Sequence, residues 1–267
     1  MPAKERLIIA LDVETAAEAR RLFDALRGSA GMFKVGSQLF TAAGPEFVRE
    51  IVSAGARVFL DLKFHDIPNT VAAASREAVR LGVALFNVHA AGGSEMMRRA
   101  AEATREEAAR LGVARPALVA VTVLTSMDAA TLAETGVEAA EAPPVEATAV
   151  TSFETAQTSS VEAAQTSSVE AQVRRLARLA DASGLDGVVA SPHEIAPVRE
   201  SVARAGFLVV TPGVRPSSVA HDDQRRVMTP GEAVRAGADF IVVGRAVLNA
   251  AEPARAAAEI VGEIEAI

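Results

Sequence analysis

Short apolar runs alternate with longer segments of helical periodicity along this chain, and the alternation repeats eight times. The apolar runs are almost unbroken, which is typical of strands in a parallel sheet whose outer face is covered. Between them, apolar residues recur every three or four positions, which predicts amphipathic helices. We expect strands at residues 7–12, 32–36, 57–63, 85–90, 117–124, 187–191, 207–213 and 240–245.

The alternation of strands and helices predicts the fold class. Strict βα order indicates an α/β protein with a parallel sheet. Eight βα units in 267 residues fit a closed (β/α)8 TIM barrel, formed as one domain over 1–267, better than an open doubly wound sheet. No G-x-G-x-x-G motif follows the first strand, which removes the main argument for a dinucleotide-binding fold.

One segment after the fifth strand, about residues 138–170, interrupts this rhythm. It contains the octapeptide AQTSSVEA twice in tandem, at 156–163 and 164–171. Its Ala, Thr, Ser, Glu and Pro residues cannot bury much apolar surface, and a period of eight is too short for a solenoid unit. We predict a duplicated surface insertion, mobile and either disordered or partly helical, and we favour this over a functional module.

Composition narrows the functional classes. The chain has no cysteine, which excludes disulfides and thiolate metal sites and favours a reducing cytoplasm. Its formal net charge of −7 argues against general nucleic-acid binding. No apolar run approaches the roughly 18 residues that a membrane span requires. The opening MPAKERLIIALDV is interpreted as a first strand and not as a secretory signal.

Charged residues close several of the predicted strands, at the end of the barrel where active sites lie. Asp61 and Lys63 are two positions apart and share a face, whereas Leu62 should point outward to the helices. Any one of these residues alone is typical of a solvated strand end, but burying several together is costly unless they pair. An alternating Lys34–Asp61–Lys63–Asp66 chain would provide that pairing. The strand-end residues are Asp12, Lys34, Asp61, Lys63, His89 and Arg245.

The eighth unit offers an anion site. Gly244 and Arg245 close the last strand, and TIM barrels often bind phosphate after strands seven and eight. Glycine permits close backbone approach, and an arginine fork matches phosphate oxygens. The long loop 213–226 would place Arg215 and Gln224 as phosphate or base contacts, although an ordinary exposed loop explains the pattern equally well.

The remaining polar residues do not indicate a metal centre. For His89 we favour a packed core residue over a catalytic one. The spacing of His65, His193 and His221 is not that of metal ligands. Asp61 and Asp66 could hold magnesium in principle, but the lysine between them argues against it.

Several segments together resemble one enzyme family. DLKFHDIPNT (61–70) contains an Asp-x-Lys-x-x-Asp-Ile-Pro-x-Thr motif, and the other segments occur in the family's order along nearly the whole chain except roughly 138–170. In this respect the sequence is similar to the bacterial orotidine 5'-phosphate decarboxylases. The other segments are LIIALDV (7–13), FKVGSQLF (33–40), FNVHAAGG (86–93), VTVLTSM (121–127), TPGVRP (211–216), DQRRVMTPGEAV (223–234) and VVGRAV (242–247).

The resemblance implies a role for each matching residue. Lys63 would be the catalytic acid, Asp61 would lie beside the substrate carboxylate, and Lys34 would belong to the same charged network. Asp66, with Ile67 and Thr70, would enter the site of the neighbouring subunit in a homodimer. The remaining positions would bind the nucleotide: Asp12 the ribose, Thr125 and Ser126 the pyrimidine, and Arg215, Gln224, Gly244 and Arg245 the phosphate.

The implied reaction is the decarboxylation of orotidine 5'-monophosphate to uridine 5'-monophosphate, the last step of de novo UMP synthesis. It would need no metal and no cofactor, because Lys63 protonates C6 after CO2 leaves. The partners would be this nucleotide and a second copy of the chain, without nucleic acid or membrane.

Three other functions fit parts of the sequence. A magnesium-dependent decarboxylase or aldolase of sugar phosphates would share the Asp-x-Lys-x-x-Asp core but not the full HDIPNT continuation. A Schiff-base aldolase would need Lys63 or Lys34 as a neutral amine, whereas the flanking carboxylates favour the charged form. A barrel that only binds a nucleotide phosphate would have no need of the costly charged cluster.

Overall fold

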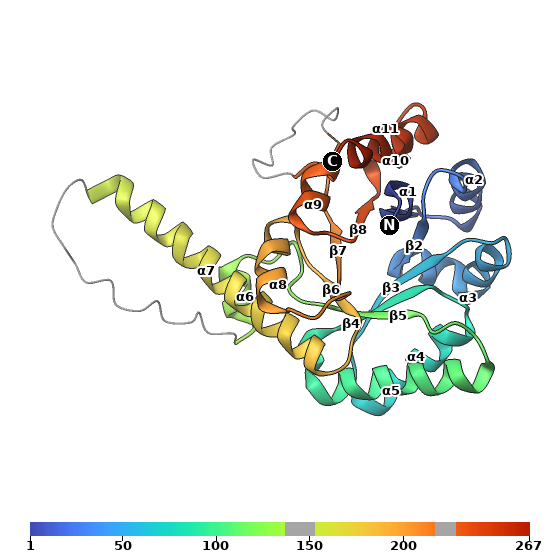
Figure 1. Cartoon of the computed structure of the whole chain (residues 1–267), viewed down its shortest axis with the longest axis horizontal. Helices are drawn as coiled ribbons and strands as arrows, with labels where there is room; N and C mark the ends of the chain where they lie inside the picture. Colours follow the sequence, from blue (N-terminus) through green and yellow to red (C-terminus); the bar gives the residue numbers. More distant parts are fainter. Residues whose placement is uncertain (137–152, 217–227) are drawn as a thin grey trace.

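The predicted barrel is present and closed. The computed structural model describes residues 1–136, 153–216 and 228–267, and eight parallel strands follow one another around the barrel in sequence order, with β8 pairing back onto β1 (Figure 1). The strands are β1 (Leu7–Ala10), β2 (Met32–Gly36), β3 (Val58–Phe64), β4 (Leu85–His89), β5 (Ala117–Val121), β6 (Gly187–Val189), β7 (Leu208–Pro212) and β8 (Phe240–Val243).

Most strands end earlier than the sequence pattern predicts. β5 stops at Val121 and not at residue 124, and β1 stops at Ala10, two residues before Asp12. At the carboxyl ends the chain leaves the sheet to form the loops over the barrel mouth, although its residues stay apolar for one or two positions more. Asp12 therefore lies on a loop directly above β1.

Helices surround the barrel. They are α1 (Ala3–Arg6), α2 (Ala16–Leu26), α3 (Ser37–Ser53), α4 (Pro68–Arg80), α5 (Gly93–Leu111), α6 (Ala129–Glu134), α7 (Phe153–Ala182), α8 (Ile195–Ser201), α9 (Pro230–Ala236), α10 (Arg245–Leu248) and α11 (Pro253–Glu265), with 3-10 turns η1 (Ala90–Gly92) and η2 (Pro192–Glu194). α3 is kinked at Gly44, which has a φ of 70° and is followed by Pro45.

No helix in the described parts of the chain combines the length and apolar character that crossing a membrane requires.

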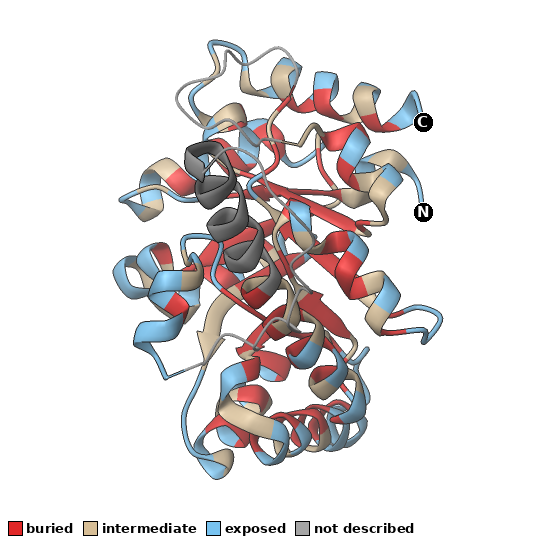
Figure 2. Cartoon of the chain, turned by 90° about the vertical axis from the view of Figure 1, so that its left-hand side faces the viewer, coloured by how far each residue is buried: buried red, intermediate tan, exposed pale blue. Residues whose placement is uncertain are grey.

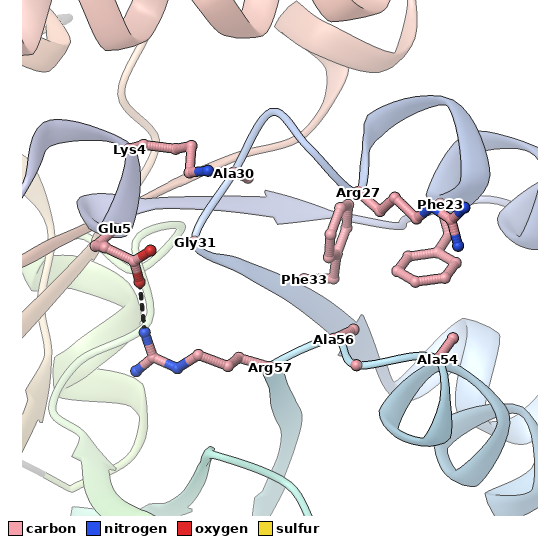
Figure 3. Close-up of a pocket in the computed structure, with 11 residues that line it drawn as sticks. Lys4, Glu5, Phe23, Arg27, Ala30, Gly31, Phe33, Ala54, Ala56 and Arg57 are labelled. Atoms are coloured by element: carbon pink, nitrogen blue, oxygen red, sulfur yellow. Dashed lines mark hydrogen bonds and ion pairs between the residues drawn. The ribbon is translucent and has the colours of Figure 1, made fainter.

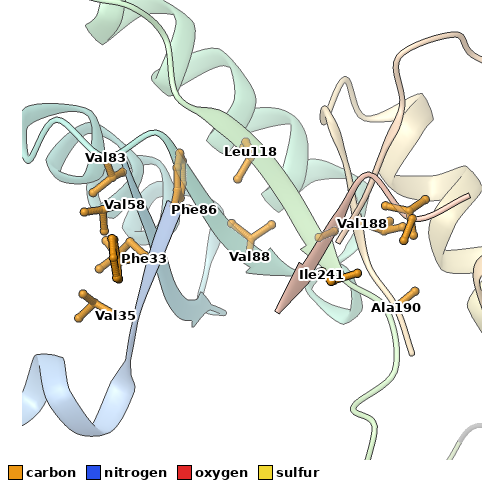
Figure 4. Packing of buried hydrophobic residues seen from close by; sticks show 14 of the residues in the cluster. Phe33, Val35, Val58, Val83, Phe86, Val88, Leu118, Val188, Ala190 and Ile241 are labelled. Atoms are coloured by element: carbon orange, nitrogen blue, oxygen red, sulfur yellow. The ribbon is translucent and has the colours of Figure 1, made fainter. Parts of the chain in front are cut away.

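The core has two layers separated by the barrel wall. Outward-facing strand residues such as Phe33, Val58, Phe86 and Ile241 pack against the helices (Figure 4). A smaller set of inward-facing residues, Ile8, Ala10, Met32, Phe59, Leu85, Val119, Val210, Phe240 and Val242, fills the barrel. The central strands are buried, and long helices around them such as α4 and α5 have one buried and one exposed face (Figure 2).

The segment after β5 differs from its prediction at its carboxyl-terminal boundary. Residues 137–152 lie outside the described residues, but the backbone from Phe153 onward belongs to the long helix α7, so both octapeptides are helical (Figure 1). Packing against the barrel begins before residue 170, because Ser168 is buried and Val169 contacts the core. Glu170 pairs with Arg174 at 2.7 Å. The last residues of the predicted insertion thus pack against the barrel.

Candidate active site

Alternate side chains of each strand point into the barrel, and this alternation brings charged residues together at its carboxyl-terminal end. Inside β2 and β3, Lys34 and Asp61 continue the inward rows that begin with Met32 and Phe59. Register aligns Lys34 with Ala10 of β1 and Asp61 with Gly36 of β2. Leu62 contacts the outer core, as predicted.

These residues form a continuous chain of alternating charges, which we call the lysine–aspartate network. Lys34 Nζ donates to Asp12 Oδ1 at 2.8 Å and lies 3.3 Å from Asp61 Oδ2. Lys63 Nζ donates to the other oxygen, Asp61 Oδ1, at 2.7 Å. The side chains of Lys34 and Asp61 are only 10% and 14% exposed, whereas that of Lys63 is 37% exposed and borders the open end of the barrel.

Asp61 is the centre of the network, and its pKa lies below the usual range. Burial is the largest single influence and opposes ionisation, but it is outweighed by the positive charge of Lys34, by the hydrogen bond and charge of Lys63 and by the hydrogen bond from Asn87. Opposite charges and donors favour the ionised carboxyl. Asp61 is therefore a carboxylate held between two ammonium groups.

Lys63 has an unusual backbone. Its φ of 52° makes it the one non-glycine residue with positive φ among the described residues. A left-handed conformation costs a side-chain-bearing residue about 1–2 kcal/mol. The pairing between β3 and β4 also shifts between Leu60 and Phe64. The strand thus deforms at the position that turns Lys63 toward the barrel mouth.

Asn87 is a site residue that the sequence analysis missed. Its Oδ1 accepts a hydrogen bond from the backbone N–H of Lys63 at 2.8 Å, and its Nδ2 donates to Asp61 Oδ1 at 2.7 Å. The side chain is fully buried. The sequence did contain one indication: Asn87 is a single amide in the apolar run LFNVH, two positions after Leu85, so both side chains should point into the barrel.

The predicted link from Lys63 to Asp66 is not formed within one chain, so the alternating chain runs Asp12–Lys34–Asp61–Lys63 and does not include Asp66. No ion pair of Asp66 occurs among the described residues; instead its Oδ1 accepts the N–H of Ile67 at 2.6 Å. Asp66, Ile67 and Thr70 are exposed on the segment that begins α4, and Ile67 is 66% exposed despite its apolar side chain.

Two histidines stack beside the network. The rings of His65 and His89 are 5.5 Å apart with an angle of 27° between their planes. His89 Nδ1 is buried without a hydrogen-bond partner in the described parts of the chain. Burial lowers the pKa of His89, and the adjacent His65 and Lys63 lower it further. These influences favour the neutral imidazole of His89, whose side chain is partly buried.

The predicted anion-binding residues lie beside the Asp12 end of the network. A Cβ added to Gly244 would be 3.8 Å from Asp12 Oδ2, so the ends of β8 and β1 are close together. Arg245 begins α10 and is exposed, and its guanidinium has no hydrogen bond or ion pair among the described residues. Its guanidinium is available to a ligand.

Of the other predicted ligand-binding residues, Arg215, Thr125 and Ser126 lie on loops. The backbone N–H of Arg215 donates to Met228 O at 3.2 Å, which holds the two described ends of the long loop together. Gln224 lies outside the described residues. Thr125 and Ser126 are exposed in the turn after β5.

A separate cavity lies at the opposite end of the barrel. It has a volume of about 250 Å³ and is lined by residues that precede β2 and β3, including Gly31 and Arg57 (Figure 3). Arg57 is paired with Glu5 at 2.8 Å, and Phe23 packs edge-to-face on Phe33. TIM-barrel chemistry occurs at the carboxyl ends of the strands, so this cavity is not the active site.

The carboxylate oxygens that could bind a metal ion in this site are paired with lysine side chains. In the parts of the chain that the structure describes, no three His, Cys, Asp or Glu side chains gather in a way that could hold a metal ion. Asp12 and Asp61 instead face ammonium groups. A closed (β/α)8 barrel with this network at its carboxyl-terminal end defines a TIM-barrel enzyme.

Comparison with known proteins identifies the family. The chain belongs to the family described as "Orotidine 5'-phosphate decarboxylase / HUMPS family", whose profile matches residues 5–147 and 136–260. A protein from Moorella thermoacetica named orotidine 5'-phosphate decarboxylase is 50% identical over 268 residues, covering 100% of this chain and 95% of that protein. One of the same name from Syntrophotalea carbinolica is 50% identical over 264 residues, covering 99% and 96%.

Solved structures agree with this assignment. The crystal structure of orotidine 5'-phosphate decarboxylase from Lactobacillus acidophilus superimposes with a TM-score of 0.76 at 32% identity, covering 97% of this chain and 98% of that one. An uncharacterized conserved protein from Geobacillus kaustophilus gives the same TM-score at 35% identity, covering 97% and 99%. The similarity thus extends over the whole barrel.

Proposed function

We propose that this protein decarboxylates orotidine 5'-monophosphate to uridine 5'-monophosphate. Two relatives that are 50% identical to it over 95% and 96% of their length are named orotidine 5'-phosphate decarboxylase. The observation that carries the proposal is the lysine–aspartate network. In it, the ammonium of Lys63 lies at the open end of the barrel and is hydrogen-bonded to the carboxylate of Asp61.

Lys63 is the proton donor of the proposed reaction. The bond between C6 of the pyrimidine and the carboxylate breaks, CO2 leaves, and the electron pair stays on C6. This vinyl carbanion has no neighbouring group that delocalises its charge, so the enzyme must stabilise it electrostatically. The Lys63 ammonium lies next to C6, stabilises the developing charge, and then transfers its proton to C6; water returns a proton to the amine.

Asp61 contributes in two ways. It anchors the ammonium of Lys63, and its own negative charge crowds the substrate carboxylate. Two like charges about 4 Å apart repel by roughly 4 kcal/mol at an effective dielectric near 20, which supplies part of the reduction in the barrier. The pairing with Lys34 keeps Asp61 ionised while it does so.

The nucleotide's phosphate and ribose supply the binding energy. Arg245 and the backbone at Gly244 bind the phosphate together with Arg215 and Gln224, and Asp12 contacts the ribose. Thr125 and Ser126 contact the pyrimidine. Binding energy from the phosphate, which takes no part in the chemistry, holds C6 against Lys63 and offsets the repulsion at Asp61. Neither a metal nor a cofactor takes part.

Two copies of the chain form the active enzyme. The exposed Ile67, near the exposed Asp66 and Thr70 in the sequence, is an apolar side chain at the rim of the site and suits a subunit contact. Asp66, which forms no ion pair among the described residues of its own chain, then enters the neighbour's site and faces Lys63 there. The homodimer acts in the cytoplasm, in keeping with a chain that has no cysteine.

Subunit mixing tests the shared site. Asp66→Asn and Lys63→Ala proteins should each be inactive, and the mixed dimer has one site with both native residues. With statistical exchange, about a quarter of wild-type activity should return. Verified exchange without any return of activity would refute the shared site.

The reaction itself is tested by incubating purified protein with orotidine 5'-monophosphate in EDTA, without added metal or cofactor. The proposal predicts loss of the orotidylate absorbance with one CO2 and one UMP formed per substrate. Activity that requires magnesium, or substrate trapped on a lysine by borohydride, would instead indicate one of the two aldolase-type functions.

A further inference from the structure

Asn87 holds together the two residues on which the proposed chemistry depends. It is fully buried on β4, and its amide spans the gap between the carboxylate of Asp61 and the backbone of Lys63 on β3. The chemistry of both partners fixes its orientation, since the N–H of Lys63 can only donate and the ionised carboxylate can only accept. An aliphatic side chain could make neither contact.

The contact to Lys63 occurs where the sheet itself is irregular. Regular pairing of β3 with β4 breaks between Leu60 and Phe64, so strand pairing does not hold the backbone at residue 63. The positive φ of Lys63 persists only if its surroundings impose it. The side chain of Asn87 supplies a hydrogen bond to Lys63 N–H at this irregular position.

The hydrogen bond from Asn87 to Asp61 orients the carboxylate of Asp61. Oδ1 of Asp61 receives both the Asn87 amide and the Lys63 ammonium, each at 2.7 Å, while Oδ2 faces Lys34. Three donors thus fix the rotation of one carboxylate, and one of the three is uncharged.

We infer that Asn87 is a positioning residue for this reaction: it sets the backbone of Lys63 and the rotation of Asp61 so that ammonium and carboxylate face the same point of the substrate. The inference rests on the proposed function. Asn87 itself is buried beneath these residues and acts through them.

The aspartate variant gives the sharpest test, because a protonated carboxyl has the same shape as the amide, with one donor and one acceptor. In Asn87→Asp, the protonated form donates to Asp61 and accepts from Lys63 N–H. The ionised form repels Asp61, and two adjacent carboxylates raise the pKa of one of them. We expect kcat to rise as the pH falls until Asp61 itself is protonated, whereas the wild type shows no rise over that range.

Asn87→Ala provides a second variant that adds no charge. A misplaced catalytic group reduces the rate by roughly 100-fold, so we expect a loss of about that size in kcat. The affinity for UMP, measured by calorimetry, should stay within about threefold, because the phosphate contacts are remote from β4. Retained UMP binding also reports that the variant is folded.

Thr104→Ala is the matched control. Thr104 is as fully buried as Asn87, and its hydroxyl donates to Ala100 O at 2.7 Å on α5, outside the network. It should lose thermal stability without losing kcat. If Asn87→Ala keeps kcat within about threefold of wild type, or Asn87→Asp shows the wild-type pH profile, Asn87 has only a structural role.

The wild type serves as the reference that separates the two proposals. Wild-type protein that does not decarboxylate orotidylate refutes the proposed function. Active wild type with unaffected Asn87 variants refutes only the positioning role.

Discussion

Asp61→Asn removes one negative charge from the centre of the lysine–aspartate network and leaves its shape unchanged. At the observed 2.7 Å, the attraction between Asp61 and Lys63 is about 6 kcal/mol at an effective dielectric near 20. More than a third of the Lys63 side chain is exposed, so solvent screening reduces this to about 3 kcal/mol. If that attraction holds the ammonium in position, its loss corresponds to a fall in kcat of roughly 100-fold.

The same substitution should affect the two nucleotides differently. Without the charge of Asp61, the substrate carboxylate is no longer repelled, so orotidylate should bind at least as tightly as to wild type. UMP has no such carboxylate, and its affinity should stay nearly unchanged. A fall in kcat without a rise in KM is the expected signature of lost ground-state repulsion and a displaced catalytic group.

Steady-state kinetics on orotidylate and calorimetry with UMP measure these effects. The control is Glu46→Gln, the same carboxylate-to-amide change in an exposed pair with Arg49 at 3.2 Å; it should leave kcat unchanged. If Asp61→Asn retains kcat within about threefold of wild type, or weakens UMP binding as much as it slows turnover, Asp61 does not hold Lys63 in position for the reaction.

Three further predictions follow from other parts of the structure. Arg245→Ala should weaken nucleotide binding strongly but hardly affect a substrate that lacks the phosphate; equal losses with both, compared with an Arg255→Ala control, would show that it is not the phosphate ligand. Replacing residues 140–166 with a short Gly/Ser linker should leave turnover within a few-fold, since loop length costs only about 0.6 kcal/mol per doubling; a folded dimer without turnover would contradict this. Hydrogen bonds from Arg110 and then Arg80 lower the pKa of Glu107 from 4.5 to about 2, so its stabilising effect is present above pH 4.5 and is lost as the pH falls toward 2. Glu107→Gln should therefore lower Tm at pH 7, and the difference from wild type should shrink over that range; a constant difference would refute the pairing.

The barrel could be predicted because it depends on local periodicity. Continuous apolar runs identified all eight strands, and alternation within a strand placed Asp61 inward and Leu62 outward. The strand ends were predicted less accurately, because apolar residues continue past the last backbone pair. The burial of Ser168 was not predicted either, since the sequence around it carries no pattern that reveals it.

The site could be predicted only in part, because its geometry depends on contacts between strands. Sequence spacing showed that Asp61 and Lys63 share a face, but not that β3 shifts its register against β4 or that Lys63 has a positive φ. Asn87 lies in an apolar run, and only the pairing of β4 beside β3 shows that it bridges Asp61 and Lys63. Asp66 was placed in the network by proximity in sequence, whereas its side chain turns to the N–H of Ile67.

The central claim is that Lys63 stabilises and protonates the carbanion at C6, and Lys63→Ala tests it most directly. Turnover of orotidylate should be measured for wild type, Lys63→Ala and a control, Lys4→Ala, in which an exposed lysine at the opposite end of the barrel is removed. We predict full activity in wild type and in the control, and no measurable turnover in Lys63→Ala despite retained UMP binding. Near wild-type turnover by folded Lys63→Ala protein would contradict the account.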